Sequence, residues 1–410
     1  MRIGILATRL SGTDGVSLEV AKWVQVLQRL GHEICYCAGE LGGYAAGGTF
    51  VPRMHFNDPL ILSLNKAAFN QDSPQTLDQL MTEIKKVAGE LNKSLLSFLQ
   101  DECINLIIVE NALAIPMNLP LAQAITDTII ESGLPVIAHH HDYFWERERF
   151  QTTLIPEFIE SVFPPDLPNI RHVSINTIAQ RRLRKRRGID SIVIPNVIDF
   201  DNPPLRPLNP GVCFRNALGL CKSQPLIVQP TRVIQRKGIE LAIELLANMA
   251  LQEPALYITH AAGDEGLAYW QWLQHEAAMM GVSLHLVDRL VRGHSSEKIF
   301  SLAEMYADAN LITYPSLYEG FGNALLESVY YKCPVVVNRY PVYNCDIRPL
   351  GFQFIELDGY VNDQAVEMAK EIILFPDKAI EWVDTNYKLA KEHFSMLVLR
   401  EKIMEIMAFL

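Results

Sequence analysis

The sequence contains no long uninterrupted apolar segment. Its most apolar stretch, residues 104–125, is broken by a glutamate, asparagines and prolines, whereas a membrane-spanning helix needs about 20 predominantly apolar residues. The first residues, MRIGILATRLSG, hold an apolar core that is too short for a secretory signal. We therefore expect a cytoplasmic protein that touches a membrane at most peripherally.

Cysteine, glycine, proline and basic residues are not abundant either. The seven cysteines are scattered, without a CxxC pair or the Cys/His spacing of a zinc site, so we expect free thiols in a reducing compartment. Glycine and proline number 23 each among 410 residues, an ordinary share that excludes collagen-like and disordered chains. The net charge of −11 at pH 7 disfavours nucleic acid as a partner.

What the sequence does hold is a regular alternation of short apolar strands and helical segments. This pattern predicts α/β architecture, with parallel sheets flanked by helices. In the first half the expected strands are residues 2–7, 32–38, 106–109, 135–138, 172–175 and 192–194. The expected helices of this half are residues 17–30, 121–131 and 177–187.

The alternation stops at DFDNPPLRPLNPG, residues 199–211, which has the composition of a linker. It then restarts with strands expected at residues 226–229, 256–260, 284–287, 311–314, 334–337 and 352–355. Helices are expected at residues 239–249 and 323–331, and the tail from about residue 379 is helical. We predict two doubly wound halves joined near residue 200, facing each other across a deep cleft, because open parallel sheets bind ligands at the carboxyl ends of their strands.

Two segments of the second half carry the strongest chemical signals. In TYPSLYEGFGNALLES, a strand is followed by Glu319, a glycine-rich loop and a helix that carries Glu327, with seven residues between the two glutamates. Glycines at a helix start let a phosphate approach the backbone, and the helix N-terminus attracts its charge. In QPTRVIQRKGIELA, Arg232 and Lys237 follow another strand and could neutralise a diphosphate leaving group.

These residues resemble the retaining GT-B glycosyltransferases, in particular glycosyltransferase family 4, the glycosyl transferases of group 1. The family has a strand–R–x4–KG–helix element, here Arg232, Lys237 and Gly238, and an E-G-F-G…E element, here Glu319 and Glu327. The similarity extends over most of the chain through HEICYCAGE, VSINTIAQ, IPNVIDF and AAGDEG.

The resemblance implies two Rossmann-like domains, an acceptor-binding domain at residues 1–200 and a donor-binding domain at residues 201–380. Residues 381–410 are implied to cross back toward the first domain. The implied enzyme is a retaining hexosyltransferase that uses a UDP-, GDP- or ADP-sugar and no obligatory cofactor or metal. Its acceptor is a saccharide, a lipid-linked saccharide or a small polyol or glycerate.

The resemblance also implies roles for individual residues. The implied catalytic residues are Arg232, Lys237, Glu319 and His141, of which Arg232 and Lys237 bind the diphosphate. Glu319 holds sugar hydroxyls and Glu327 the ribose. The remaining donor contacts are Gly12, Gly15, Gly263, Phe321, Gly322, Asn323, Ala324 and Leu325.

On the acceptor side, three consecutive histidines precede the run DYFWERERF. The expected acceptor-side residues are His139, His140, Asp142, Tyr143, Trp145 and Arg147. The pair His141–Asp142 best matches a His-Asp pair of the family, and which of the three histidines faces the donor stays open. No metal site is expected here, because consecutive side chains of a strand point to opposite faces.

Two further points leave alternatives open. The basic run from Arg181 to Arg187 is interpreted as a solvated helix face, with peripheral contact to an anionic membrane as the alternative. A GT-B enzyme of another class, such as a sugar-nucleotide epimerase or a phosphorylase, and a non-catalytic sugar-nucleotide-binding protein are the alternative functions.

Overall fold

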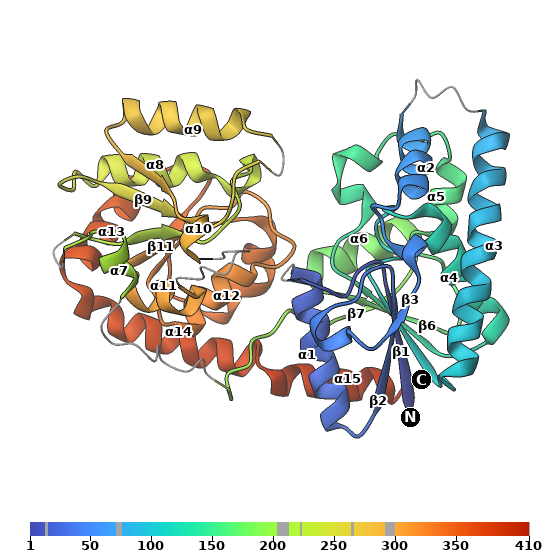
Figure 1. Cartoon of the computed structure of the whole chain (residues 1–410). Helices are drawn as coiled ribbons and strands as arrows, with labels where there is room; N and C mark the ends of the chain where they lie inside the picture. The colour runs from blue at the N-terminus through green and yellow to red at the C-terminus, as the bar shows by residue number, and fades with distance from the viewer. Residues whose placement is uncertain are drawn as a thin grey trace. The chain divides into compact units, whose positions relative to one another are not determined.

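The computed structural model describes residues 1–12, 15–70, 76–202, 213–221, 224–263, 266–291 and 300–409. The chain divides into two units, one made of Met1–Val197 and Met396–Leu410, the other of Ile198–Ser395. Each unit holds one parallel sheet covered by helices (Figure 1). Residues 203–211 of the expected linker lie outside the described residues.

The sheet of the first unit has seven strands in the order β3-β2-β1-β4-β5-β6-β7. They are β1 (Arg2–Ala7), β2 (Glu33–Ala38), β3 (Thr49–Phe50), β4 (Leu106–Glu110), β5 (Val136–His140), β6 (Ile170–Ser174) and β7 (Ser191–Val193). The central strands are mostly apolar and almost completely buried because both of their faces are covered. The order reverses between β1 and β4, where a parallel sheet opens a crevice for ligands.

The helices of this unit include a pair that the sequence pattern did not reveal. The helices are α1 (Gly15–Arg29), α2 (Pro59–Phe69), α3 (Leu77–Asp101), α4 (Leu119–Ser132), α5 (Pro156–Val162), α6 (Thr177–Arg187) and α15 (Met396–Met407). No elements were predicted for residues 39–105, yet β3, α2 and α3 lie there. The 25-residue helix α3 begins with a capping box between Thr76 and Gln79 and packs on α4.

The C-terminal segment expected at residues 381–410 divides at Ser395. Helix α14 (Ile380–His393) belongs to the second unit, whereas α15 belongs to the first. Figure 1 shows α15 beside α1, where Leu399 and Ile403 are fully buried in the same apolar cluster as Trp23. Phe394 stays in the second unit because its ring packs on Phe321, with centroids 5.4 Å apart.

The sheet of the second unit has six strands in the order β10-β9-β8-β11-β12-β13. They are β8 (Ile227–Gln229), β9 (Ala255–Ile258), β10 (Ser283–Leu286), β11 (Leu311–Tyr314), β12 (Val335–Asn338) and β13 (Ile355–Leu357). The helices are α7 (Phe214–Ala217), α8 (Ile239–Asn248), α9 (Ala268–Met279), α10 (Asp288–Val291), α11 (Leu302–Asp308), α12 (Asn323–Tyr330), α13 (Asp363–Leu374) and α14. Here the strand order reverses between β8 and β11.

The last strand begins later than the predicted residues 352–355. It begins at Ile355 and continues through Glu356, which pairs with Val337 of β12. The apolar pattern suggested an end before this glutamate, but Arg339 and Arg348 bind its carboxylate at 2.7 and 3.0 Å. Within the described part of the chain, no helix is long and apolar enough to cross a membrane.

A buried glutamate of α1 fastens the chain where the first unit ends. The carboxylate of Glu19, 1% exposed, accepts the backbone N–H of Val197 at 3.2 Å. It also accepts a hydrogen bond from the ammonium of Lys22 at 2.7 Å, and that ammonium donates to the carbonyl of Val197 as well. One side chain therefore ties the helix to the exit of the chain.

We expect Glu19→Ala to lower the free energy of unfolding by about 1–3 kcal/mol, because a buried N–H loses its acceptor. Urea unfolding of the whole chain measures the loss. The control Glu33→Ala removes the same side chain from an exposed ion pair with Arg2 and should change stability by less than about 1 kcal/mol. Equal losses in the two variants would contradict the role of Glu19.

Candidate active site

Buried polar groups join β8 and β11 where the order of the second sheet reverses. Gln229, the last residue of β8, accepts a hydrogen bond from the hydroxyl of Thr313 in β11 at 3.1 Å. The amide of Gln229 donates to the carbonyl of Lys237 at 3.2 Å. Both Gln229 and Thr313 are completely buried. These bonds fix the loop after β8 against the carboxyl end of β11.

A compact charge cluster lies in these two loops. The ammonium of Lys237 donates to Oε1 of Glu319, and Arg236 donates to Oε2 of the same carboxylate at 3.0 Å. Lys237 and Glu319 are only 8% and 7% exposed. Burial raises the pKa of Glu319, but Lys237 and Arg236 outweigh it, so the pKa lies below its ordinary value. The carboxylate is therefore ionised at neutral pH, with two cations beside it.

Gly238 lets the two loops approach each other this closely. Its φ of +61° is left-handed, and a Cβ there would lie 2.4 Å from the carbonyl oxygen of Pro315. The backbone N–H of Leu317 donates to the carbonyl of Arg236 at 2.8 Å. A side chain at position 238 would therefore push Lys237 away from Glu319.

A second glycine, Gly322, lies directly before α12 and allows a tight turn there. Gly322 precedes the helix with φ +129°, and a Cβ would lie 2.4 Å from the hydroxyl of Tyr340. That hydroxyl donates to the carbonyl of Phe321 at 2.8 Å. The turn presents the first backbone N–H groups of an eight-residue helix, the arrangement that suits a phosphate.

The predicted donor residues along α12 differ in what they can offer. Asn323 and Ala324 form its partly exposed first turn, whereas the side chain of Leu325 is buried and its N–H is bonded to the carbonyl of Gly322 at 3.0 Å. Leu325 therefore supports the turn from within. Glu327 is half-buried and accepts a hydrogen bond from Tyr306 at 3.2 Å.

Arg232 and Gly263 belong to neighbouring loops of the same sheet edge. A backbone bridge joins Val233 to Ala262, which places the exposed Arg232 near the glycine turn after β9. Gly263 has a left-handed φ of +117°. The second unit thus gathers Arg232, Lys237, Glu319, Gly263 and the start of α12 at one edge.

The glycine loop of the first unit is described only in part. Gly12 has φ +75° and Gly15 begins α1, but Thr13 and Asp14 lie outside the described residues. The loop before Gly12 is held by Leu10, which bridges to Leu41.

The three histidines separate to opposite sides of the first sheet. His139 and His141 both lie against Glu110 of β4, at 3.0 and 3.4 Å from its Oε2. Burial raises the pKa of Glu110, but the two imidazoles lower it to about 2. His140 instead contacts His172 of β6, with ring nitrogens 2.9 Å apart. The structure therefore brings His139 and His141 together at Glu110 and places His140 on the other side of the sheet.

The acceptor-side run after β5 is a loop of two short turns with a mostly buried aromatic base. Tyr143 is completely buried and its hydroxyl lies 2.9 Å from that of Ser174, while its ring stacks on Trp145 at 4.6 Å. Asp142 accepts hydrogen bonds from Arg147 at 2.6 Å and from Asn111 at 3.1 Å. In this run Arg147, Glu148 and Arg149 are exposed, and Asp142 is half-buried.

The sequence is similar to that of known proteins. The family model described as "Glycosyl transferases group 1" matches residues 214–349. The chain is 32% identical to a mannosylglucosylglycerate synthase of Petrotoga mobilis over 405 residues, covering 91% of this chain and 92% of that protein. The chain belongs to the glycosyl transferases of group 1. A mannosylglucosylglycerate synthase of Thermotoga maritima is 31% identical, with 97% of both chains covered.

Solved structures of other proteins share the fold of this glycosyltransferase. HepE of Anabaena in complex with UDP and glucose matches with a TM-score of 0.66 at 14% identity, covering 100% of both chains. A glycosyltransferase of Rickettsia africae matches with a TM-score of 0.66 at 15% identity, covering 99% of this chain and 97% of that one. The expected GT-B fold and hexosyltransferase class are confirmed.

Three polar residues of this glycosyltransferase were missed by sequence reasoning. Arg236 immediately precedes Lys237, and its bond to Glu319 depends on a loop conformation that no spacing reveals. Glu110 lies one residue beyond the predicted strand 106–109, and Asn111 follows it with a left-handed φ of +57°. Their position at a strand end was the available signal, because ligands bind at that edge.

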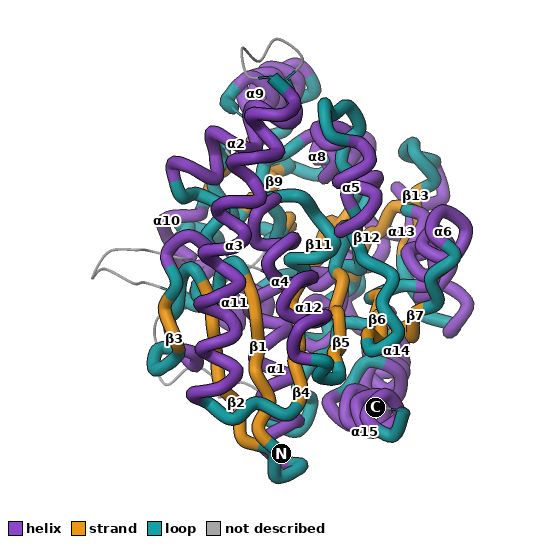
Figure 2. Tube along the Cα trace, turned by 90° about the vertical axis from the view of Figure 1, so that its right-hand side faces the viewer, coloured by secondary structure: helices purple, strands orange, loops and turns teal. Residues whose placement is uncertain are grey.

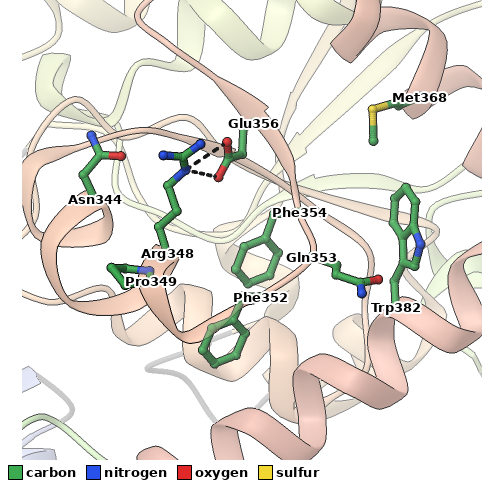
Figure 3. Close-up of a pocket in the computed structure, with 9 residues that line it drawn as sticks. All are labelled: Asn344, Arg348, Pro349, Phe352, Gln353, Phe354, Glu356, Met368 and Trp382. Atoms are coloured by element: carbon green, nitrogen blue, oxygen red, sulfur yellow. Dashed lines mark hydrogen bonds and ion pairs between the residues drawn. The ribbon is translucent and has the colours of Figure 1, made fainter.

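A hollow of about 690 Å³ also lies in the second unit, against β13 (Figure 3). Phe352 and Phe354 stack there with centroids 5.6 Å apart, and Arg348 binds Glu356 across it at 3.0 Å. The residues that line it come from the segment before β13, from β13 itself and from helices α13 and α14, and they do not include the Lys237–Glu319 cluster.

We expect removal of one partner of the buried pair to cost more stability than removal of both. Glu319→Gln leaves the ammonium of Lys237 buried without its carboxylate, which costs about 3–5 kcal/mol. The double variant Glu319→Gln with Lys237→Met should recover most of that loss. Urea unfolding measures both, and equal stability of the single and double variants would contradict a coupled buried pair.

Proposed function

We propose that this glycosyltransferase moves a hexosyl group, with retention of configuration, from a nucleoside-diphosphate sugar to a hydroxyl of a small glycerate-type acceptor. The observation that carries the proposal is the cluster of Lys237, Arg236 and Glu319 beside the start of α12. Two cations and a helix N-terminus suit the charge of a diphosphate, and a carboxylate suits the hydroxyls of a sugar.

The donor contacts that we propose are those implied by the family resemblance. Arg232 and Lys237 bind the diphosphate, Glu319 accepts hydrogen bonds from sugar hydroxyls, and Glu327 accepts them from the ribose. The backbone from Phe321 to Asn323 contacts the phosphate. A solved neighbour in complex with UDP and glucose and another state of it in complex with UDP-glucose support a nucleotide-sugar donor for this chain.

The reaction breaks the bond between the anomeric carbon and the diphosphate oxygen and forms a bond to the acceptor oxygen. Negative charge grows on the leaving diphosphate, where fixed cations stabilise it. The acceptor proton passes to a leaving phosphate oxygen, so no nucleophile of the protein and no obligatory metal is needed at the diphosphate.

We place the acceptor in the first unit, at the carboxyl ends of β4 and β5. His141 is the catalytic residue of this unit, since it is more exposed than His139, at 9% against none. Asp142 and Arg147 offer hydrogen-bonding groups to an acceptor with hydroxyls and a carboxylate. The relatives named mannosylglucosylglycerate synthases support an acceptor of this class and mannose as the sugar.

The basic run of α6 favours this small acceptor over a membrane-bound one. Arg182 pairs with Glu146 at 3.1 Å and Arg187 with Glu160 at 2.9 Å, while Arg186 lies over the ring of Trp145. These contacts support a solvated helix face that is bound to its own unit.

We expect nucleoside diphosphates to stabilise the protein against unfolding. Among GDP, UDP, ADP and their sugar conjugates, we expect the ligands with one of these nucleotides to stabilise it most. A ligand at 100 times its dissociation constant adds about 2.7 kcal/mol to the free energy of unfolding. Thermal unfolding with and without each nucleotide measures the effect. Arg232→Ala and Lys237→Met should each abolish most of it.

The control is Lys332→Ala, which removes a lysine of the same unit from an exposed pair with Asp384 and should keep the full stabilisation. Each variant is compared with itself in the absence of nucleotide, so a change in intrinsic stability does not enter. Stabilisation that survives in both site variants would contradict the donor site.

A further inference from the structure

Three ligating side chains converge in the first unit, at the carboxyl ends of β4 and β5. Oε2 of Glu110 lies 3.0 Å from Nδ1 of His139 and 3.4 Å from Nε2 of His141. One ligand atom from each residue lies within 4.8 Å of the others. Glu110, His139 and His141 are 2%, 0% and 9% exposed. The cluster is therefore buried, and it opens toward His141.

The backbone explains why these three meet. Glu110 pairs with His139 across the parallel ladder of β4 and β5, strands that run side by side in Figure 2. His139 and His141 are two residues apart and point to the same side, whereas His140 points to the other. Because side chains alternate along the strand, three consecutive histidines cannot all bind one ion. Two of them, His139 and His141, share a side, and Glu110 of the neighbouring strand is the third ligand.

We propose that Glu110, His139 and His141 bind a divalent transition-metal ion of the zinc type. Ligand atoms at about 2.0–2.2 Å from a tetrahedral ion lie about 3.3 Å from one another, close to the 3.0 and 3.4 Å found here. Two imidazoles and one carboxylate, with a fourth position open, form a ligand set of known zinc enzymes.

The chemistry of the cluster favours this class of ion. Imidazole ligands suit zinc, cobalt and iron, whereas magnesium prefers an all-oxygen shell. Oε1 of Glu110 is buried and has no hydrogen-bond partner, so the carboxylate has a free oxygen to turn toward a cation. An ion would also compensate a carboxylate charge that is held away from water.

The proposal does not depend on the proposed donor site, but it shares His141 with the proposed acceptor site, where this side chain would act as a ligand of the ion. The donor cluster lies in the second unit, around Lys237 and Glu319, whereas these ligands lie in the first. Metal binding is measured without any nucleotide or acceptor, so its failure would leave the transferase assignment untouched, and the reverse also holds.

The test is titration of the chelator-treated full-length protein with Co²⁺, followed by visible absorption, and then displacement by Zn²⁺. We expect one Co²⁺ per chain, a tetrahedral spectrum, and no displacement by Mg²⁺. Glu110→Gln and His139→Gln should each weaken binding by more than about 100-fold, because loss of even an outer partner of a metal ligand costs about 10–100-fold.

The matched control is His140→Gln. It removes a histidine of the same strand that is equally buried, but that faces His172, and it should leave the affinity for Co²⁺ unchanged. Binding that persists in Glu110→Gln and His139→Gln, or that is lost equally in the control, would overturn the proposal.

X-ray absorption of the zinc-loaded wild-type protein gives an answer that needs no variant. We expect a shell of nitrogen and oxygen at about 2.0–2.1 Å with the outer scattering of two imidazoles. A sulfur shell would assign the ion to exposed cysteines such as Cys103 and Cys345 and overturn the proposal. No binding by the wild-type protein would show that the cluster is held by hydrogen bonds alone.

Discussion

The buried ion pair between Lys237 and Glu319 is the constraint on which the rest of the candidate active site depends. Two charges can lie this far from water only if their partners are fixed. The structure fixes them through Gln229 and Thr313 beneath, through Arg236 beside the carboxylate, and through a glycine that lets the two loops touch. The strand order of the sheet brings both loops to one point, so the fold itself creates the charged platform that we assign to the donor diphosphate.

The first unit also has buried polar side chains at the ends of its strands. Alternation along β5 directs His139 and His141 to Glu110, and directs His140 to His172. Each of these buried side chains thus has a partner on the neighbouring strand, while Oε1 of Glu110 has no hydrogen-bond partner. The loop that follows buries its aromatic residues, leaves Asp142 half-buried and exposes Arg147, Glu148 and Arg149. The acceptor site and the metal site that we propose therefore share the same two strand ends.

Sequence reasoning predicted the two parallel sheets and the GT-B fold. It did so because strand and helix periods, and the glycines at helix starts, are local properties of the chain. It missed α2 and α3 between residues 39 and 105, and also α5. It placed β13 too early, because the contacts of Arg339 and Arg348 with Glu356 form only in the folded chain. Arg236 and Glu110 were missed for the same reason, since each acquires its partner only through the pairing of separate strands or loops. The division of the C-terminal segment at Ser395 depends on tertiary packing of Phe394.

Transfer itself is the most direct test of the central claim, that the chain is a retaining transferase acting on a glycerate-type acceptor. The protein is incubated with α-linked nucleoside-diphosphate hexoses and a panel of glycerate, glycosylglycerates and neutral polyols, and the product is analysed by NMR. The account predicts release of the nucleoside diphosphate only with a carboxylate-bearing acceptor, together with an α-linked product. A β-linked product, or conversion of the donor without any acceptor, would contradict it.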